Sequence, residues 1–201
     1  MKEAVNTSRW PKTAVLATLL LVLVFPVWAE SPGKVRTYLA GPLGFSEVGR
    51  KFQYEVLVPA LEQNGAIVID PWKLTDKKRI DEVISLPLGD EKVAAWRALN
   101  LVIGRNNAEA IDSCELIVAI LDGTDVDSGT AAEIGYAFGK GKRIIGYRGD
   151  FRLSADNEGA VVNLQVEYFI KASGGNIFRT LDLLTRAVSE YEHSPDRVVA
   201  K

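Results

Sequence analysis

Residues 116–142 constrain the fold more than any other stretch of this chain. Residues 116–121 form a continuous apolar run of strand length, which is typical of a strand covered on both faces in a parallel sheet. Asp122-Gly123 ends this run, and the apolar residues within 131–138 predict a helix. Ligands in open α/β sheets bind where a strand ends and the next helix begins, so this turn is the expected place for a site.

Two carboxylates, Asp127 and Glu133, fall at this predicted helix start. Helix capping would account for both acids without any functional role. Asp127, Ser128 and Thr130 are all candidate N-caps. Thr130 and Glu133 also match the capping box, in which the acid bonds back to the backbone N–H of the cap. A second possibility is that both acids face a ligand, and the local pattern leaves the two possibilities open.

The rest of the chain alternates between predicted strands and helices. Further strands are predicted at 35–41, 66–69 and 143–147, and helices at 46–64, at 91–113 with a possible break at Gly104, and at 177–191. Residues 72–89 show no sustained period and are interpreted as a long loop, of the kind that often forms a lid. Residues 161–171 fit a strand or a short helix, and a fifth strand beginning near Gln165 is favoured.

This alternation predicts an α/β fold: a single flavodoxin-like domain with a five-stranded parallel sheet and helices on both faces. The domain is expected to span residues 30–192, and residues 193–201 form a polar C-terminal tail. Neither G-x-G-x-x-G nor G-x-x-x-x-G-K-[ST] is present, so the loop after the first strand is not expected to cradle phosphate.

The first 29 residues have the features of a secretory signal peptide. Lys2, Arg9 and Lys12 precede an uncharged apolar stretch over residues 13–29, and cleavage is expected after Ala29. The mature protein would then be periplasmic or extracellular. The alternative is an uncleaved leader that anchors the chain in a membrane, although the stretch is shorter than a span of roughly 20 residues and contains Pro26.

Composition excludes several functional classes. The formal charge of −2 becomes about −4 once the predicted leader is removed, and no basic run interleaved with aromatics suggests a nucleic acid partner. Cys114 is the only cysteine and is expected to pack inertly in the core. His193 is the only histidine, which disfavours histidine-based metal sites and Ser-His-Asp triads.

The string Asp-Ser-Gly-Thr-Ala-Ala-Glu-Ile-Gly-Tyr-Ala, which begins at Asp127, resembles the signature of the nucleoside 2-deoxyribosyltransferases. The resemblance implies that Glu133 is a covalent nucleophile and that Asp127 helps to hold the sugar. It also implies that Tyr38, in the first strand, hydrogen-bonds the nucleophilic carboxylate. From the residues alone, Tyr38 could equally be a core aromatic. The Tyr38 bond and the positive helix start would favour ionised Glu133.

The same resemblance implies five substrate-binding positions: Gly41, Asp70, Asn107, Gly129 and Asn163. Asn107 stands where some members have an Asp that handles the leaving base, and an amide cannot hand over a proton. Asn163 resembles a residue that reaches the sugar of a neighbouring subunit, which implies a homo-oligomer of at least two chains. Taken alone, Asn163 would be an ordinary loop residue.

The implied activity is transfer of a 2-deoxyribosyl group between purine or pyrimidine bases through a covalent intermediate on Glu133. The expected partners are 2′-deoxynucleosides and free nucleobases, and neither a metal nor a cofactor is expected. One alternative is an N-glycoside hydrolase acting on 2′-deoxynucleosides or their 5′-monophosphates. Another is a non-catalytic exported nucleoside-binding module, in which Glu133 merely caps its helix.

Overall fold

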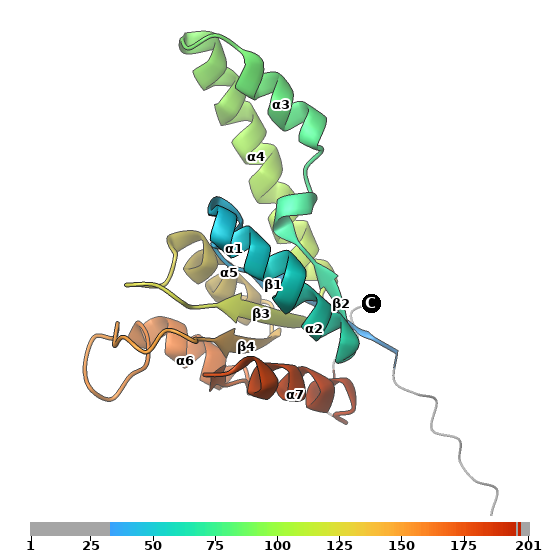
Figure 1. Cartoon of the computed structure of the whole chain (residues 1–201), viewed down its shortest axis with the longest axis vertical. Coiled ribbons are helices and arrows are strands. Elements are labelled where there is room, and N and C mark those ends of the chain that lie inside the picture. The colour runs from blue at the N-terminus through green and yellow to red at the C-terminus, as the bar shows by residue number, and fades with distance from the viewer. Residues whose placement is uncertain (1–32, 196, 198–201) are drawn as a thin grey trace, which may run out of the picture. The chain divides into compact units, whose positions relative to one another are not determined.

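The computed structural model describes residues 33–195 and residue 197. Five strands form one sheet in the order β2-β1-β3-β4-β5, and every neighbouring pair is parallel (Figure 1). Their bounds are β1 Val35–Ala40, β2 Ala66–Ile69, β3 Leu116–Ile120, β4 Arg143–Tyr147 and β5 Ile177–Phe178. Every residue of β3 is buried. The predicted five-stranded parallel sheet with flavodoxin-like order is therefore confirmed.

Helices cover both faces of the sheet. Alternate residues of β1 belong to two separate apolar clusters, because successive side chains of a strand point to opposite faces. Tyr38 and Ala40 pack in one cluster with residues of α4 (Asp90–Ser113), α5 (Ser128–Gly139) and α6 (Leu164–Ala172). Val35 and Leu39 pack in the other with residues of α2 (Val58–Gln63) and α7 (Leu181–Glu192).

The helix predicted over residues 46–64 is confirmed, with one irregular turn. It consists of α1 (Glu47–Phe52), a π-helical turn η2 (Gln53–Leu57) and then α2. The Ser46 side chain accepts a hydrogen bond from the backbone N–H of Gly49 at 2.9 Å and so caps the first turn.

The prediction of a loop over residues 72–89 is wrong. This stretch contains a short 3₁₀ turn, η3 (Pro71–Lys73), and the helix α3 (Lys77–Ser85), which is capped by the Asp76 side chain. The predicted break at Gly104 is also wrong, since α4 runs from Asp90 to Ser113 without interruption. Gly104 faces open space, so it costs only the roughly 1 kcal/mol of its lower helix propensity, too little to interrupt so long a helix.

The favoured strand near Gln165 is wrong as well. Residues 164–172 form α6, whose start is fixed by the Asn163 side chain accepting from the backbone N–H groups of Gln165 and Val166. The fifth strand is instead the two-residue β5, and α7 begins only at Leu181, four residues later than predicted.

The predicted leader, residues 1–29, lies outside the described residues. Within the described part of the chain, no helix combines the length and apolar character needed to cross a bilayer. Cys114 is buried, and burial raises the pKa of its thiol to about 11. A buried thiol that stays protonated is a poor nucleophile, in keeping with the expected packing role.

Candidate active site

A cavity of about 490 Å³ opens beside the carboxyl ends of β1 and β3. A volume of this size is typical of sites for small organic ligands. One wall comes from the loop after β1 and from the start of α5, and the opposite wall comes from η3, α3 and α4. The lining residues are Gly41, Phe45, Pro71, Trp72, Thr75, Ile80, Trp96, Asn100, Ile103, Asn107, Asp127, Thr130 and Glu133.

Glu133 points into this cavity and does not cap its helix. Its Oε1 accepts a hydrogen bond from the Tyr38 hydroxyl at 2.6 Å and a longer one from Asn107 Nδ2 at 3.5 Å. The N-cap of α5 is Asp127, whose Oδ2 accepts from the Thr130 backbone N–H at 2.9 Å. The capping-box alternative for Glu133 is therefore wrong, because Thr130 lies inside the helix rather than at its cap.

The electrostatics of Glu133 differ from the sequence expectation. Burial raises its pKa to about 7, and the charge of Asp127 acts in the same direction, whereas the Tyr38 hydrogen bond lowers the pKa. The hydrogen bond is present as expected, but the loss of hydration outweighs it. Burial and the Glu133 carboxylate in turn raise the pKa of Tyr38 well above its ordinary value, so the phenol keeps its proton and acts as the donor.

Asp127 fits both explanations that the sequence allowed. It caps α5 through one carboxylate oxygen, which also accepts from the Thr130 hydroxyl at 3.1 Å, and it lines the cavity together with Glu133. Asn107, on α4, lines the same cavity. Three chain segments that are distant in sequence thus bring Tyr38, Asn107, Asp127 and Glu133 together.

The remaining predicted binding residues take different positions. Gly41 lines the cavity, and a Cβ there would lie 2.9 Å from Ile120 Cβ, so the close approach of the two strand ends requires a glycine. Gly129 is exposed on the first turn of α5 and is not among the lining residues. Asp70 does not line the cavity either. Its carboxylate accepts from the Tyr54 hydroxyl at 2.9 Å and from the Trp72 backbone N–H at 3.0 Å, which fixes the turn that carries Trp72.

Asn163 lies away from the cavity that contains Glu133. Its side-chain oxygen caps α6, and the residue lines a separate hollow of about 320 Å³. The other residues around that hollow are Thr124, Asp125, Ser154, Ala155 and Asp156. Within one chain, Asn163 therefore does not meet the other predicted site residues.

The aromatic part of the cavity wall was missed from the sequence. Trp72 stands edge-on to Phe45, with ring centroids 4.6 Å apart and planes at 88°, and its indole lies directly over Gly44. Trp96 and Ile103 lie in the helix predicted over residues 91–113, but nothing in the local pattern showed that this helix borders a cavity. The only available signal was that two tryptophans occur within 25 residues.

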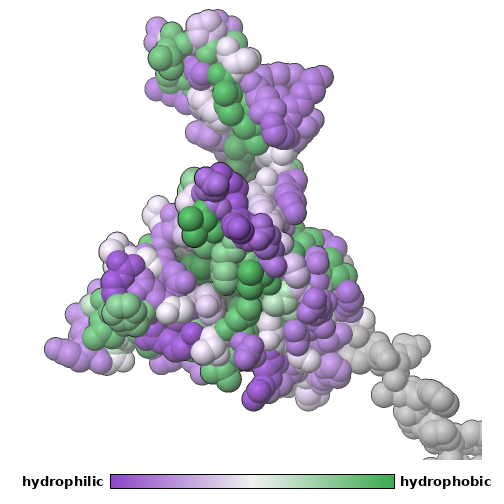
Figure 2. Space-filling view, viewed as in Figure 1, coloured by the Kyte–Doolittle hydropathy of each residue, from purple (hydrophilic) through white to green (hydrophobic). Residues whose placement is uncertain are grey.

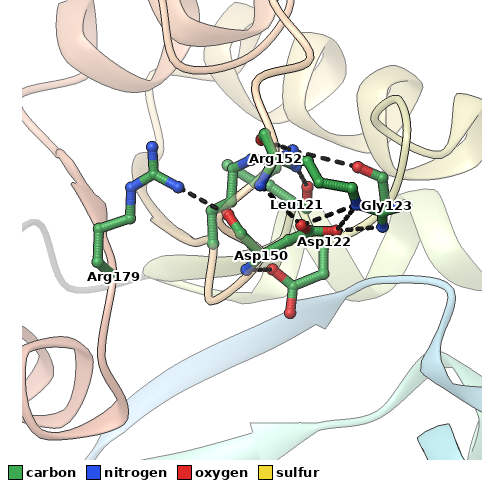
Figure 3. A network of polar contacts seen from close by, with 7 residues as sticks. Leu121, Asp122, Gly123, Asp150, Arg152 and Arg179 are labelled. Atoms are coloured by element: carbon green, nitrogen blue, oxygen red, sulfur yellow. Dashed lines mark hydrogen bonds and ion pairs between the residues drawn. The ribbon is translucent and has the colours of Figure 1, made fainter.

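Asp150 and Arg152, in the loop after β4, help to tie two loops together at the same edge of the sheet (Figure 3). The Asp150 backbone N–H donates to Asp122 at 2.8 Å, the Asp150 carboxylate pairs with Arg152, and Arg179 donates to the Asp150 carbonyl at 2.8 Å. The Arg152 guanidinium holds the pKa of Asp150 well below its usual range. None of these four residues lines the cavity, so their contacts stabilise the loops around it.

Fully buried Arg148 reinforces the same connection between the loops. Its guanidinium donates to the backbone carbonyls of Leu121, Gly123 and Arg152. As for metals, residues 33–195 and 197 contain no group of three or more His, Cys, Asp or Glu side chains placed to hold an ion.

Comparison with known proteins identifies a family and a shared fold. The family model described as nucleoside 2-deoxyribosyltransferase matches residues 37–165. No curated protein sequence matches the chain.

Three solved structures share the fold. A 2-deoxyribosyltransferase from Leishmania mexicana is 21% identical with a TM-score of 0.55, and covers 80% of this chain and 99% of its own. A conserved protein from Enterococcus faecalis V583 is 24% identical with a TM-score of 0.54, at 79% and 99% coverage. A 2-deoxyribosyltransferase from Bacillus psychrosaccharolyticus is 22% identical with a TM-score of 0.50, at 75% and 90% coverage. Since the family model spans well over half of its residues, the chain belongs to the nucleoside 2-deoxyribosyltransferase family.

Proposed function

We propose that this protein transfers a 2-deoxyribosyl group from one nucleobase to another through a covalent intermediate on Glu133. The observation that carries the proposal is the 2.6 Å hydrogen bond from the Tyr38 hydroxyl to Glu133 Oε1. A residue of the central sheet, 95 positions away, holds the carboxylate toward the cavity instead of toward the amides of its own helix. A carboxylate held in this way is free to attack an anomeric carbon.

The chemistry follows from the demands of an N-glycosidic bond. As the C1′–N bond breaks, its electron pair stays on the base, and positive charge develops at C1′. A Glu133 oxygen forms a bond to C1′ and captures the sugar. A second base then attacks C1′ from the face that the first base left, which releases Glu133. Two inversions give net retention. A 2′-hydroxyl would withdraw electrons beside C1′, so 2′-deoxy substrates are favoured.

A transfer assay tests the proposal directly. The protein is incubated with 2′-deoxyinosine and adenine, and the products are separated by chromatography. Formation of 2′-deoxyadenosine supports transfer, whereas hypoxanthine and free deoxyribose alone would indicate a hydrolase. Binding without turnover would indicate a non-catalytic module. Glu133→Ala should lower turnover at least about a thousandfold while the circular dichroism spectrum stays unchanged.

We also propose that Asn163 completes the site of a neighbouring chain in a homo-oligomer. Its position outside the Glu133 cavity of its own chain supports this arrangement. A subunit-mixing experiment tests it with Glu133→Ala and Asn163→Asp, the second chosen because Asp retains the oxygen that caps α6. Mixed oligomers should regain activity, since one of their sites combines an intact Glu133 with an intact Asn163. No recovery after verified subunit exchange would contradict a shared site.

Export is a separate proposal. It is supported by the charged and apolar pattern of residues 1–29. Expression of the full chain in a bacterium, followed by fractionation and N-terminal sequencing, should give a periplasmic protein that begins at Glu30. A full-length chain in the membrane fraction would instead support an uncleaved anchor.

A further inference from the structure

We propose that Asn107 lets the nucleobase leave as an anion, held by a hydrogen bond rather than protonated by an acid. The proposal rests on the function proposed above and names the substrates that the site should prefer. These are 2′-deoxynucleosides whose free base has an acidic ring N–H, such as the oxo-substituted pyrimidines and purines. Nucleosides of weakly acidic bases, such as cytosine, should be poor donors.

Asn107 is placed where it can contact both Glu133 and a bound base. The residue lines the cavity from α4, and its Nδ2 lies 3.5 Å from Glu133 Oε1. An amide nitrogen has two hydrogens, so one can point to Glu133 while the second points to a base attached to the attacked carbon. Both hydrogens remain on nitrogen during the reaction, because a carboxamide is not an acid in water.

The other lining residues offer no acid that could protonate the departing base. Among the described residues around the cavity, only Asp127 and Glu133 have ionisable side chains. Glu133 must be ionised in order to attack, and Asp127 uses Oδ2 as an acceptor for both the N–H and the hydroxyl of Thr130. The Tyr38 hydroxyl already donates to Glu133. Burial and the Glu133 charge make Tyr38 a still weaker acid than a free phenol.

The reaction balances without a protein acid. The electron pair of the C1′–N bond stays on the ring nitrogen, the negative charge spreads onto the carbonyl oxygens of the base, and the Asn107 amide donates to the anion. The free base then takes a proton from water. In the second half, the acceptor base loses its N–H proton to solvent before attacking C1′. The rate of the first half should therefore follow the acidity of the departing base.

The test compares donors of nearly equal shape. Release of base is followed in single turnovers with 2′-deoxyuridine, 5-fluoro-2′-deoxyuridine and 2′-deoxycytidine. Fluorine makes the uracil ring more acidic with little change in size, so we expect the fluorinated donor to react about tenfold faster than 2′-deoxyuridine, and 2′-deoxycytidine to react slowest. Equal rates for the first two donors would overturn the proposal without any variant having to fold.

Two variants sharpen the test. Asn107→Asp supplies a group that can be protonated, so the ratio between the fluorinated and plain donors should fall toward one and 2′-deoxycytidine should become a better donor. Asn100→Asp is the matched control. It places the same new carboxyl in the same cavity on the same helix, two turns or about 10 Å away, and should leave the ratio unchanged.

The outcomes separate the two proposals. Turnover with an unchanged ratio in Asn107→Asp, or an equal change in Asn100→Asp, would overturn the role of Asn107 while transfer itself stood. If the wild-type protein turned over no donor at all, 2′-deoxyinosine included, the proposed function would be overturned instead.

Discussion

The two walls of the cavity are built in opposite ways. The polar wall comes from the sheet and from α5. Fully buried Tyr38 donates a hydrogen bond to the Glu133 carboxylate at 2.6 Å. Thr130, which is 1% exposed, donates its backbone N–H to the Asp127 carboxylate at 2.9 Å. The apolar wall comes mainly from the hairpin of α3 and α4, which extends away from the sheet (Figure 1). No residue of α3 is buried, and apolar side chains stand at the hairpin surface (Figure 2).

This difference suits the two walls to different functions, bond breaking and base binding. Bond breaking requires groups held close to one geometry, and a rigid sheet edge provides that. A base can be bound by aromatic and aliphatic surfaces that shift slightly to fit it. Changes in the polar wall should therefore alter reaction rates and their pH dependence, as should changes at Asn107 of α4, whereas changes in the apolar side chains of the hairpin should alter binding.

The largest effect should be a gain of stability when the charge of Glu133 is removed. Its carboxyl ionises near 4.5 when unfolded and near 7 when folded, so the folded state binds more protons between these values and loses stability as pH rises. Glu133→Gln should raise the free energy of unfolding by up to about 3 kcal/mol at pH 8 and by under about 1 kcal/mol at pH 5. Urea unfolding at both pH values measures this.

The control for that measurement is Glu82→Gln, on the exposed surface of α3. It should change stability by less than about 0.5 kcal/mol at either pH. If Glu133→Gln raised the free energy of unfolding no more at pH 8 than at pH 5, burial would not be destabilising the charged form of Glu133. The polar wall would then be no more constrained than the hairpin.

Removing the Tyr38 hydroxyl should produce the next largest effect. Tyr38→Phe should lower kcat about 10- to 100-fold, because the variant loses a hydrogen bond that positions the charged carboxylate proposed as the nucleophile. The same bond lowers the pKa of Glu133, so the rise of kcat/KM with pH, expected near 7 in the wild type, should move to higher pH. Tyr54→Phe, which removes a hydrogen bond to Asp70 instead, should leave the pH of this rise unchanged. If the rise of kcat/KM did not move in Tyr38→Phe, another group would control the pH dependence.

The polar wall could be predicted from the sequence because its geometry is local. The apolar run of β3, the acidic turn and the start of α5 follow one another directly, so the local pattern puts Asp127 and Glu133 at the end of a strand. It left open whether they cap the helix or face a ligand, and only the family resemblance implied the bond from Tyr38. The parallel sheet followed from the alternation of strands and helices, although the fifth strand was predicted at the wrong residues. What the local pattern could not supply was the degree of burial, and so the raised pKa of Glu133 was missed.

The hairpin wall could not be predicted because it depends on how distant segments fold back. Ile80, Val83 and Ile84 of α3 do stand at helical spacing, but the run is short and was overlooked among the charges around it. Trp72 and Trp96 both line the cavity only because the turn between α3 and α4 folds the chain back. The two-residue β5 is too short to leave a periodic signal, so α6 was mistaken for the last strand.

A smaller effect, on binding, should follow from truncating the hairpin wall. Trp96→Ala should raise KM about tenfold and change kcat by less than about threefold, because stacking on a base contributes roughly 1–3 kcal/mol to binding in both ground and transition states. Trp96→Phe should recover most of the loss. Steady-state kinetics with 2′-deoxyinosine measure both parameters. A fall in kcat as large as the rise in KM would show that the hairpin also positions the reacting atoms.

The smallest effect should come from the opposite face of the same helix. Leu101 is 74% exposed on α4, whereas Ile103 lines the cavity two residues later. Leu101→Ser should leave KM unchanged and shift stability by less than about 0.5 kcal/mol, while Ile103→Ser should raise KM severalfold. Differential scanning fluorimetry and steady-state kinetics measure these effects, and analytical ultracentrifugation measures mass. If Leu101→Ser lowered both the mass of the particle and its stability, the outer face of α4 would be a subunit contact. In that case a neighbouring chain would hold the hairpin as firmly as the sheet holds the polar wall.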